Sequence, residues 1–80
     1  EAYALGEALY REGSFDDARA KLLSAIQLDP RYPQPHRAVA RLYERAGDIA
    51  KTRYHLDRYL RLGGRDPDYR VRRWLEDHKE

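Results

Sequence analysis

The sequence contains no cysteine, no methionine and no asparagine, and only one tryptophan. Without cysteine, neither a disulfide framework nor a thiolate metal site can form, and this absence is compatible with any compartment. No run of about 18 apolar residues occurs, so we expect no helix that spans a membrane. Because residue 1 is Glu rather than Met, we expect the chain to be a piece of a longer one.

The three histidines offer little for catalysis or metal binding. His36, His55 and His78 are widely separated, and none of the short spacings typical of zinc ligands occurs. We expect His36 to be a structural packing residue and His55 to be solvated. The pair Gly63-Gly64 lacks the context of a phosphate-binding loop and is expected to form only a loop. We therefore expect no catalytic residue, no cofactor, no metal and no enzymatic activity.

Charge is spread unevenly, although the formal net charge is only +2. Residues 1–30 hold three basic and six acidic side chains, whereas residues 31–80 hold thirteen basic and eight acidic ones. Thirteen of the sixteen basic residues are arginines, whose planar guanidinium suits carboxylates and phosphates. Codon bias in a GC-rich genome would also explain this preference.

Apolar residues recur at helical spacing, and glycine and proline punctuate the pattern. The expected helices cover residues 1–12, 15–28, 35–46 and 49–62, followed by a last helix that Asp66 caps and Pro67 opens. Gly13 and Gly47 mark two tight turns. Ser14, with Asp17 in a variant capping box, would cap the second helix, and Asp48 would cap the fourth. The pattern predicts an all-α fold.

The apolar stripes predict which side chains face inward. On the first two helices these are Leu5, Leu9, Ala18, Leu22, Leu23, Ala25 and Ile26, and on the next two Ala38, Val39, Leu42, Tyr43, Ile49, Thr52, Leu56, Tyr59 and Leu60. On the last helix they are Val71, Trp74, Leu75 and His78. Small residues, Gly6 among them, would let the first two helices approach closely. The last helix would cover the apolar edge of the preceding pair.

The two halves of the chain repeat with a period of 34 residues. Leu5 recurs as Val39, Gly13 as Gly47, and Leu22 as Leu56. A fixed period in this range is typical of helical repeat arrays, in which neighbouring units bury one another's apolar faces. We therefore expect two helical hairpins that stack side by side.

The first unit resembles the tetratricopeptide repeat family, whose pattern combines Leu-Gly with later alanines and a closing proline. The residues that carry the resemblance are Ala2, Leu5, Gly6, Leu9, Ala18, Leu22, Ala25 and Pro30. Their counterparts in the second unit are His36, Val39, Ala40, Tyr43, Thr52, Leu56, Tyr59 and Gly64. Because Thr52, Tyr59 and Gly64 depart from the pattern, we expect the fourth helix to pack further from its partner.

The resemblance implies a right-handed α-α superhelix of five helices in a single domain, residues 1–80. Residues 1–32 would form the first repeat, residues 33–66 the second, and residues 67–80 a capping helix. It also implies a non-enzymatic protein-protein interaction scaffold, in which the first helix of each pair lines a concave groove. The expected groove residues are Tyr3, Glu7, Tyr10, Arg11, Arg37, Arg41, Glu44, Arg45 and Arg73. Gln34 and Arg70 are further candidates on the third and last helices.

Arg37, Arg41 and Arg45 recur every four residues, so they are expected to form one basic ridge. Like charges at this spacing repel, which favours a protein or peptide partner with acidic side chains or a C-terminal carboxylate. Some family members clamp a carboxylate with Lys and Asn, but this chain has no Asn, so that clamp is not reproduced. A solvated arginine face is the simpler interpretation.

Two other functions remain open. Apolar surface at the ends of a repeat array favours self-association, so a homo-oligomer or a larger repeat assembly is the main alternative. Basic residues near aromatic ones could also bind nucleic acid. The acidic first unit and the small net charge oppose that function.

Overall fold

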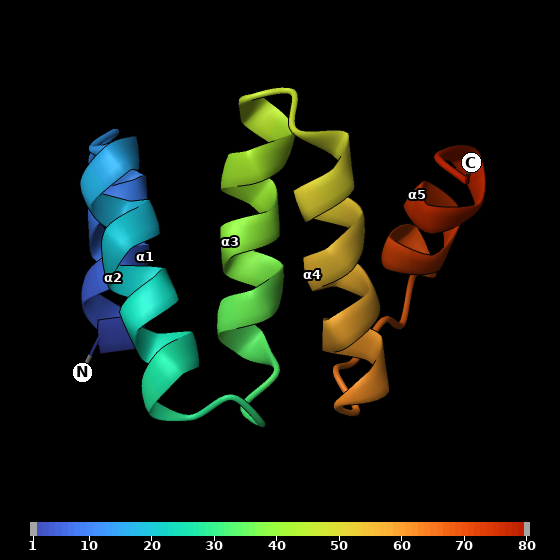
Figure 1. Ribbon diagram of the computed structural model, residues 1–80, viewed down its shortest axis with the longest axis horizontal. Helices are drawn as coiled ribbons and strands as arrows, with labels where there is room; N and C mark the ends of the chain where they lie inside the picture. The colour runs from blue at the N-terminus through green and yellow to red at the C-terminus, as the bar shows by residue number, and fades with distance from the viewer. Residues whose placement is uncertain (1, 80) are drawn as a thin grey trace.

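A computed structural model describes residues 2–79 of the chain as five helices, and this range contains no strand. The helices are α1 (Ala2–Arg11), α2 (Phe15–Leu28), α3 (Gln34–Arg45), α4 (Ile49–Arg61) and α5 (Arg70–Asp77). Figure 1 shows two antiparallel hairpins, α1–α2 and α3–α4, followed by α5. The all-α repeat fold expected from the sequence is confirmed.

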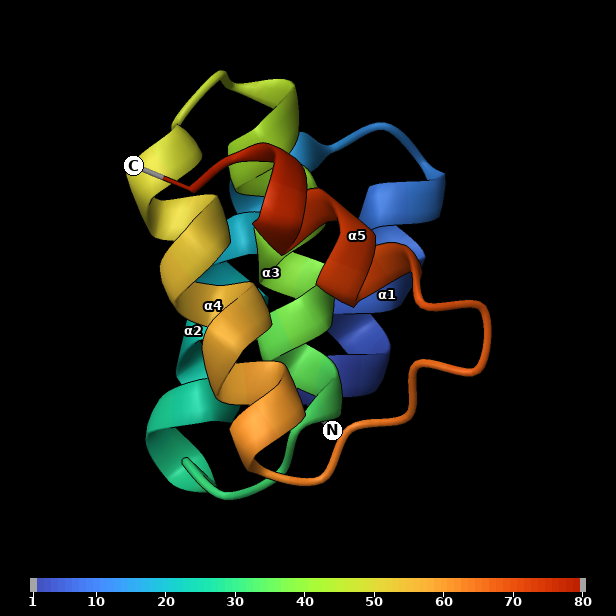
Figure 2. The ribbon, with the colours of Figure 1, turned by 90° about the vertical axis from the view of Figure 1, so that its right-hand side faces the viewer.

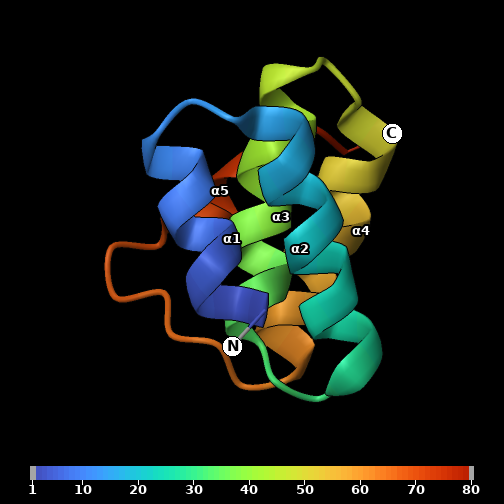
Figure 3. The same cartoon turned by 90° about the vertical axis from the view of Figure 1, so that its left-hand side faces the viewer.

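The helices form two layers. Seen along the stack, α1 and α5 lie toward one side and α2 and α4 toward the other (Figures 2 and 3). The main contacts join α1 to α2, α3 to α4, and α2 to α3, whereas α5 makes a smaller contact with α4. The α3–α4 pair is about as extensively packed as the α1–α2 pair. The wider spacing expected for the second repeat is therefore not found.

Three of the helices end in the same way. Gly13, Gly47 and Gly63 adopt positive φ angles of 84°, 80° and 88°. The amide that follows each glycine donates to a carbonyl five residues back: Ser14 to Leu9, Asp48 to Tyr43, and Gly64 to Tyr59, at 2.8–2.9 Å. This is the Schellman arrangement, in which glycine takes the left-handed position without steric cost. The segment expected to be only a loop at Gly63 is thus a third copy of the helix-ending turn.

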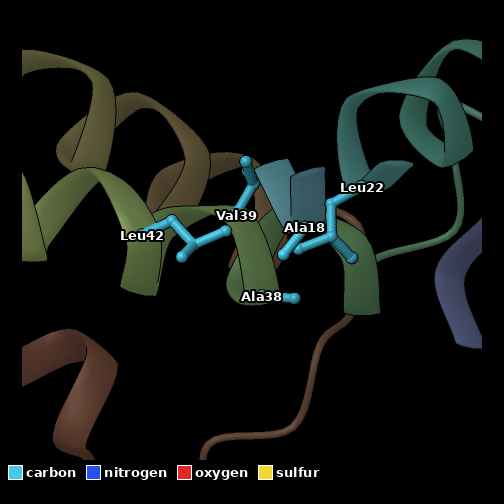
Figure 4. Packing of buried hydrophobic residues seen from close by; sticks show 5 residues of the cluster. All are labelled: Ala18, Leu22, Ala38, Val39 and Leu42. Atoms are coloured by element: carbon cyan, nitrogen blue, oxygen red, sulfur yellow. The ribbon is translucent and has the colours of Figure 1, made fainter. Parts of the chain in front are cut away.

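The first hydrophobic cluster joins the two hairpins. It contains Ala18, Leu22, Ala38, Val39 and Leu42 (Figure 4). Gly6 of α1 packs so closely against Leu22 of α2 that a Cβ added to Gly6 would lie 2.7 Å from Leu22 Cγ. The close approach predicted from the small residues is therefore present at Gly6, where any side chain would displace a fully buried leucine.

The second cluster lies between the second hairpin and α5. Its buried members are Ala40, Leu56, Tyr59 and Val71, and Leu60, Trp74 and Leu75 pack against them. Val71, Trp74 and Leu75 thus lie inward, as expected of a helix that covers the end of the array. The Tyr59 hydroxyl donates to the Arg65 carbonyl at 2.6 Å and so ties the connection before α5 to α4.

Several expected positions are wrong. Leu5, Leu23 and Ile49 were assigned to the core, but their exposed fractions are 47%, 37% and 39%. The apolar stripes are wider than the faces that neighbouring helices cover, so these residues lie at their edges. His55 was expected to be solvated and is buried instead. Its side of α4 packs toward α3, where it meets His36.

The helix caps follow the prediction only in part. Asp48 caps α4, since its carboxylate accepts from the Lys51 amide at 3.1 Å. Ser14 does not act in this way, because within the described part of the chain its side chain makes no cap hydrogen bond to α2. The capping box predicted there is therefore wrong.

The last helix begins later than expected. Asp66 does cap it, accepting from the amides of Val71 and Arg72 at 3.0 Å each. Pro67 does not open it, because residues 66–69 form a turn that ends at Tyr69, whose φ is 56°. α5 therefore starts at Arg70, and Asp66 reaches it from across this turn.

Candidate functional site

A groove of about 650 Å³ runs between α1, α3 and α5. The walls come from Tyr3 and Glu7 of α1, from Gln34, Arg37, Arg41 and Glu44 of α3, and from Arg70 and Trp74 of α5. The floor comes from Ala38, Ala40, Thr52, Leu56, Tyr59 and Val71. The first helix of each hairpin and the capping helix thus face one hollow, with α4 beneath it.

The groove gathers part of the expected site. Tyr3, Glu7, Arg37, Arg41 and Glu44 line it, whereas Tyr10, Arg11, Arg45 and Arg73 do not. Tyr10 and Arg45 pack instead near the turn of the first hairpin, where each contacts Phe15. Arg11 and Arg73 are exposed outside the groove.

Other lining residues were not among the expected nine. Trp74, Tyr59 and Thr52 had been assigned to the core, and Gln34 and Arg70 complete the two ends of the walls. The repeat carries a signal for the wall of α5, because Arg70 follows Arg37, and Trp74 follows Arg41, by 33 residues. The capping helix therefore occupies the place that the first helix of a third repeat would take.

The three arginines of α3 lie over aromatic rings and do not stand free. The guanidinium Cζ of Arg37 is 5.6 Å from the ring centroid of Tyr59, that of Arg41 is 4.6 Å from Tyr10, and that of Arg45 is 4.0 Å from Phe15. Stacking of this kind stabilises each cation by about 0.5–1 kcal/mol at an exposed site. The aromatic partners offset the repulsion expected along the ridge.

Arg41 is further engaged by α1. Its Nη2 donates to Glu7 Oε1 at 2.6 Å, and the hydroxyl of Tyr3 donates to Glu7 Oε2 at 3.3 Å. Burial raises the pKa of the Tyr3 hydroxyl, and the neighbouring Glu7 carboxylate raises it further. The α1 wall is thus a closed network in which the arginine charge is already neutralised.

The α5 wall uses its acid differently. Glu44 Oε2 accepts from the indole Nε1 of Trp74 at 3.0 Å and so holds α5 against α3. The indole also stacks on His78, with ring centroids 3.9 Å apart. Glu44 therefore fixes the position of Trp74 at the groove.

Asp66 lies close to this wall. Burial alone would raise the pKa of its carboxyl group, but the hydrogen bonds from the Val71 and Arg72 amides and the charges of Arg72 and Arg37 lower it below its ordinary value. Arg72 pairs with it at 3.6 Å. Asp66 is therefore ionised and already held by these partners, and within residues 2–79 Arg37 forms no direct ion pair.

Residues 2–79 contain no group of three or more His, Cys, Asp or Glu side chains placed to hold a metal ion. Over the same range, every helix is too short or too polar to cross a membrane.

Comparison with known proteins agrees with the repeat architecture. A family model described as TPR repeat matches residues 6–47, just over half of the chain and most of the first three helices. No curated protein matches the chain. The matched segment contains the Gly6–Leu22 contact, the Gly13 and Gly47 turns, and the interface between α2 and α3. The chain belongs to the tetratricopeptide repeat family.

Proposed function

We propose that this chain is a non-enzymatic scaffold that holds an extended segment of a partner protein in the groove between α1, α3 and α5. Repeats of this family generally mediate protein-protein interactions and are typically not enzymes. The observation that carries the proposal is the make-up of the groove, which has an apolar floor below a rim that contains arginines.

The floor suits apolar side chains of a bound segment. Ala38, Leu56, Tyr59 and Val71 are buried and line it, and Trp74 borders it. The groove's volume falls within the range of sites that enclose small ligands or a few side chains. An extended peptide presents alternate side chains to one surface, so every second side chain could enter the groove.

The rim favours a carboxylate at the end formed by α3 and α5. Arg41 is paired with Glu7. By contrast, neither Arg37 nor Arg70 forms an ion pair within residues 2–79, although both line the groove. The partner group that fits is an acidic side chain or the free C-terminus of a peptide, which arginine binds through charge-assisted hydrogen bonds.

Binding of defined peptides would test the proposal. A library of extended peptides with apolar and acidic residues, each with a free or an amidated C-terminus, would be measured by fluorescence anisotropy. We expect Arg37→Ala/Arg70→Ala to weaken binding at least about tenfold, because a hydrogen bond to a charged group contributes about 1.5–3 kcal/mol. Preference for the free C-terminus would identify a terminal carboxylate as the group bound.

Arg11→Ala/Arg31→Ala is the matched control, since it removes the same charge from exposed positions outside the groove that form no ion pair within residues 2–79. It should change affinity less than twofold at physiological salt. Equal loss in both double variants would indicate a general charge effect and contradict a bound carboxylate at Arg37 and Arg70. Failure of every peptide in the library would contradict the groove as a peptide site.

A second candidate function is self-association through the first hairpin. Leu5 and Leu23 are exposed there, and a shallow hollow is lined by Ala2, Ala4, Leu5, Lys21 and Ser24. In the second hairpin Val39, the counterpart of Leu5, is fully buried against α2. Sedimentation over a wide concentration range would show a dimer that Leu5→Lys abolishes. A monomer throughout would exclude this candidate.

A further inference from the structure

Two buried histidines meet between α3 and α4 of the second hairpin. His36 Nδ1 lies 3.1 Å from His55 Nδ1, and His36 Nε2 lies 3.3 Å from the Pro30 carbonyl oxygen. The exposed fractions of the two residues are 3% and 8%. One chain of contacts therefore links the α2–α3 connection, the first turn of α3 and the middle of α4.

The chemistry of the three atoms determines the proton positions. A carbonyl can only accept, so His36 carries a proton on Nε2 and, when neutral, has a lone pair on Nδ1. His55 must then carry its proton on Nδ1 and donate to His36. Its own Nε2 is left without a proton. The neutral pair therefore holds one defined tautomer of each ring.

One added proton can be accommodated, but two cannot. With one extra proton, His55 carries protons on both Nδ1 and Nε2. A single proton therefore still lies between the two Nδ1 atoms. With two, both Nδ1 atoms carry protons, and two N–H groups oppose each other at 3.1 Å. The hydrogen bond is then replaced by repulsion between two buried cations.

Aromatic rings pack against His55, and the charges that act on the pair oppose protonation. Tyr43 of α3 stacks on the His55 ring with centroids 5.6 Å apart, and the Tyr54 ring meets it edge-on at 5.0 Å. The charges that act on the pair are those of Lys51 and Arg58 of α4, both cationic. The α2–α3 connection contributes the neutral Pro30 carbonyl.

The shifts in pKa have the corresponding direction. Burial, together with the neighbouring charges of His36 and Lys51, lowers the pKa of His55 to about 4. Burial also lowers the pKa of His36, helped by the charge of Arg58 and opposed by the hydrogen bond to Pro30. Both rings are therefore neutral in the folded protein at pH 7.

The pair lies next to the groove in the sequence and in the fold. His36 stands in the first turn of α3, between Gln34 and Arg37, which both line the groove. Opening of the pair would free this turn from α4, whereas the His36 Nε2–H would still donate to the Pro30 carbonyl.

We propose that His36 and His55 form a proton-sensitive latch between α3 and α4, which double protonation breaks, releasing the first turn of α3 and with it the Gln34–Arg37 end of the groove. The latch operates through the fold and does not depend on the identity of any partner.

The tautomers provide a direct test in the wild-type protein. Imidazole ¹⁵N shifts at pH 7.5 should show His36 protonated on Nε2 and His55 on Nδ1, with a scalar coupling between the two Nδ1 nuclei across the hydrogen bond. The coupling should vanish on acidification while the protein still gives helical circular dichroism. A His55 ring protonated only on Nε2 at neutral pH, or two rings that titrate independently near pH 6.5, would overturn the proposal.

Hydrogen exchange tests the mechanical consequence. After correction for intrinsic rates, opening of the first turn of α3 should increase as the pH falls from 6.5 to 4, by about tenfold per pH unit for each histidine kept neutral. His55→Asn keeps an N–H donor at the position of Nδ1 but cannot titrate. In this variant, opening of the first turn of α3 should therefore increase about tenfold less per pH unit than in the wild type. Identical pH dependence in wild type and His55→Asn would overturn the latch.

The third histidine provides the matched control. His78 caps the end of α5, and its ring contacts Trp74 and not His36 or His55. His78→Asn should retain the steep pH dependence at the first turn of α3. Loss of that dependence in His78→Asn as well would show that acid acts on the whole fold and not on the latch.

Discussion

The two hairpins have the same helix order and the same turn but join their helices with different chemistry. In the α1–α2 hairpin, Gly6 lets the helices approach until Leu22 fills the contact. In the α3–α4 hairpin, the buried groups include Thr52, whose hydroxyl donates to the Asp48 carbonyl at 2.7 Å, and the His36–His55 pair. The first hairpin is held by apolar packing, and the second also by buried polar groups.

The positions of the histidine pair make the contrast sharper. One period earlier, His36 corresponds to Ala2 and His55 to Lys21, and neither of these is buried. These positions are buried in the second hairpin, where the Pro30 carbonyl meets His36 and the rings of Tyr43 and Tyr54 lie against His55. Buried polar groups need partners, and the two rings supply them for each other. The same repeat geometry thus tolerates a polar core when the polar groups are mutually satisfied.

The largest expected effect comes from the leucines that correspond in the two hairpins. Leu22→Ala should lower the free energy of unfolding by about 3–4 kcal/mol, because Leu22 of α2 is fully buried against α1 and α3. Leu56→Ala should cost about 2–3 kcal/mol, because Leu56 lines the groove and solvent can fill the space left. Urea unfolding followed by circular dichroism measures both.

If Leu22→Ala does not fold, the smaller truncations Leu22→Val and Leu56→Val provide the comparison. The contrast between the hairpins would be contradicted if the substitution at position 56 cost as much as the one at position 22, since the groove floor would then be as tightly packed as the core.

The helix caps give an effect of intermediate size. Asp48→Ala should destabilise the protein by about 1 kcal/mol, because the carboxylate accepts from the Lys51 amide at the start of α4. Ser14→Ala, at the corresponding position before α2, should cost less than about 0.5 kcal/mol, because this side chain makes no cap hydrogen bond in the described structure. Thermal and urea unfolding of the two variants provide the measurement, and equal losses would show that Ser14 does cap α2 in solution.

Local signals in the sequence predicted the helices well. The ends of the first four helices agree with the structure to within one residue, because glycine turns and apolar periodicity act over a few residues. The late start of α5 was missed, since a left-handed Tyr69 has no sequence signature. The repeat period predicted the groove walls on α1 and α3 but not the groove floor. Tyr59 and Thr52 belong to the apolar stripe of α4, so the sequence alone assigns them to the core.

The sequence pattern did not predict contacts between residues that lie far apart along the chain. His55 was expected in solvent because its partner His36 lies 19 residues away and meets it only in the register of α3 against α4. In the same way, the sequence predicted the ridge of Arg37, Arg41 and Arg45. It did not indicate which of the three arginines an acidic side chain would neutralise. That depends on the distance between α1 and α3, which brings Glu7 to Arg41, whereas Arg37 forms no ion pair within residues 2–79.

The Glu7–Arg41 pair gives the smallest effect and joins the two hairpins. A double-mutant cycle with Glu7→Gln and Arg41→Ala should give a coupling free energy of about 0.5 kcal/mol, because the pair is only partly shielded from solvent. Arg41→Ala alone should cost about 1 kcal/mol, since it also loses the stacking on Tyr10. The Arg61–Asp57 pair, within α4 and equally short at 2.7 Å, is the control, with an expected coupling of about 0.3–0.5 kcal/mol. Both couplings should shrink in 1 M salt. A cross-hairpin coupling near zero would mean that Arg41 moves freely in solution, and Arg41 would then join Arg37 and Arg70 as a cation available to a bound carboxylate.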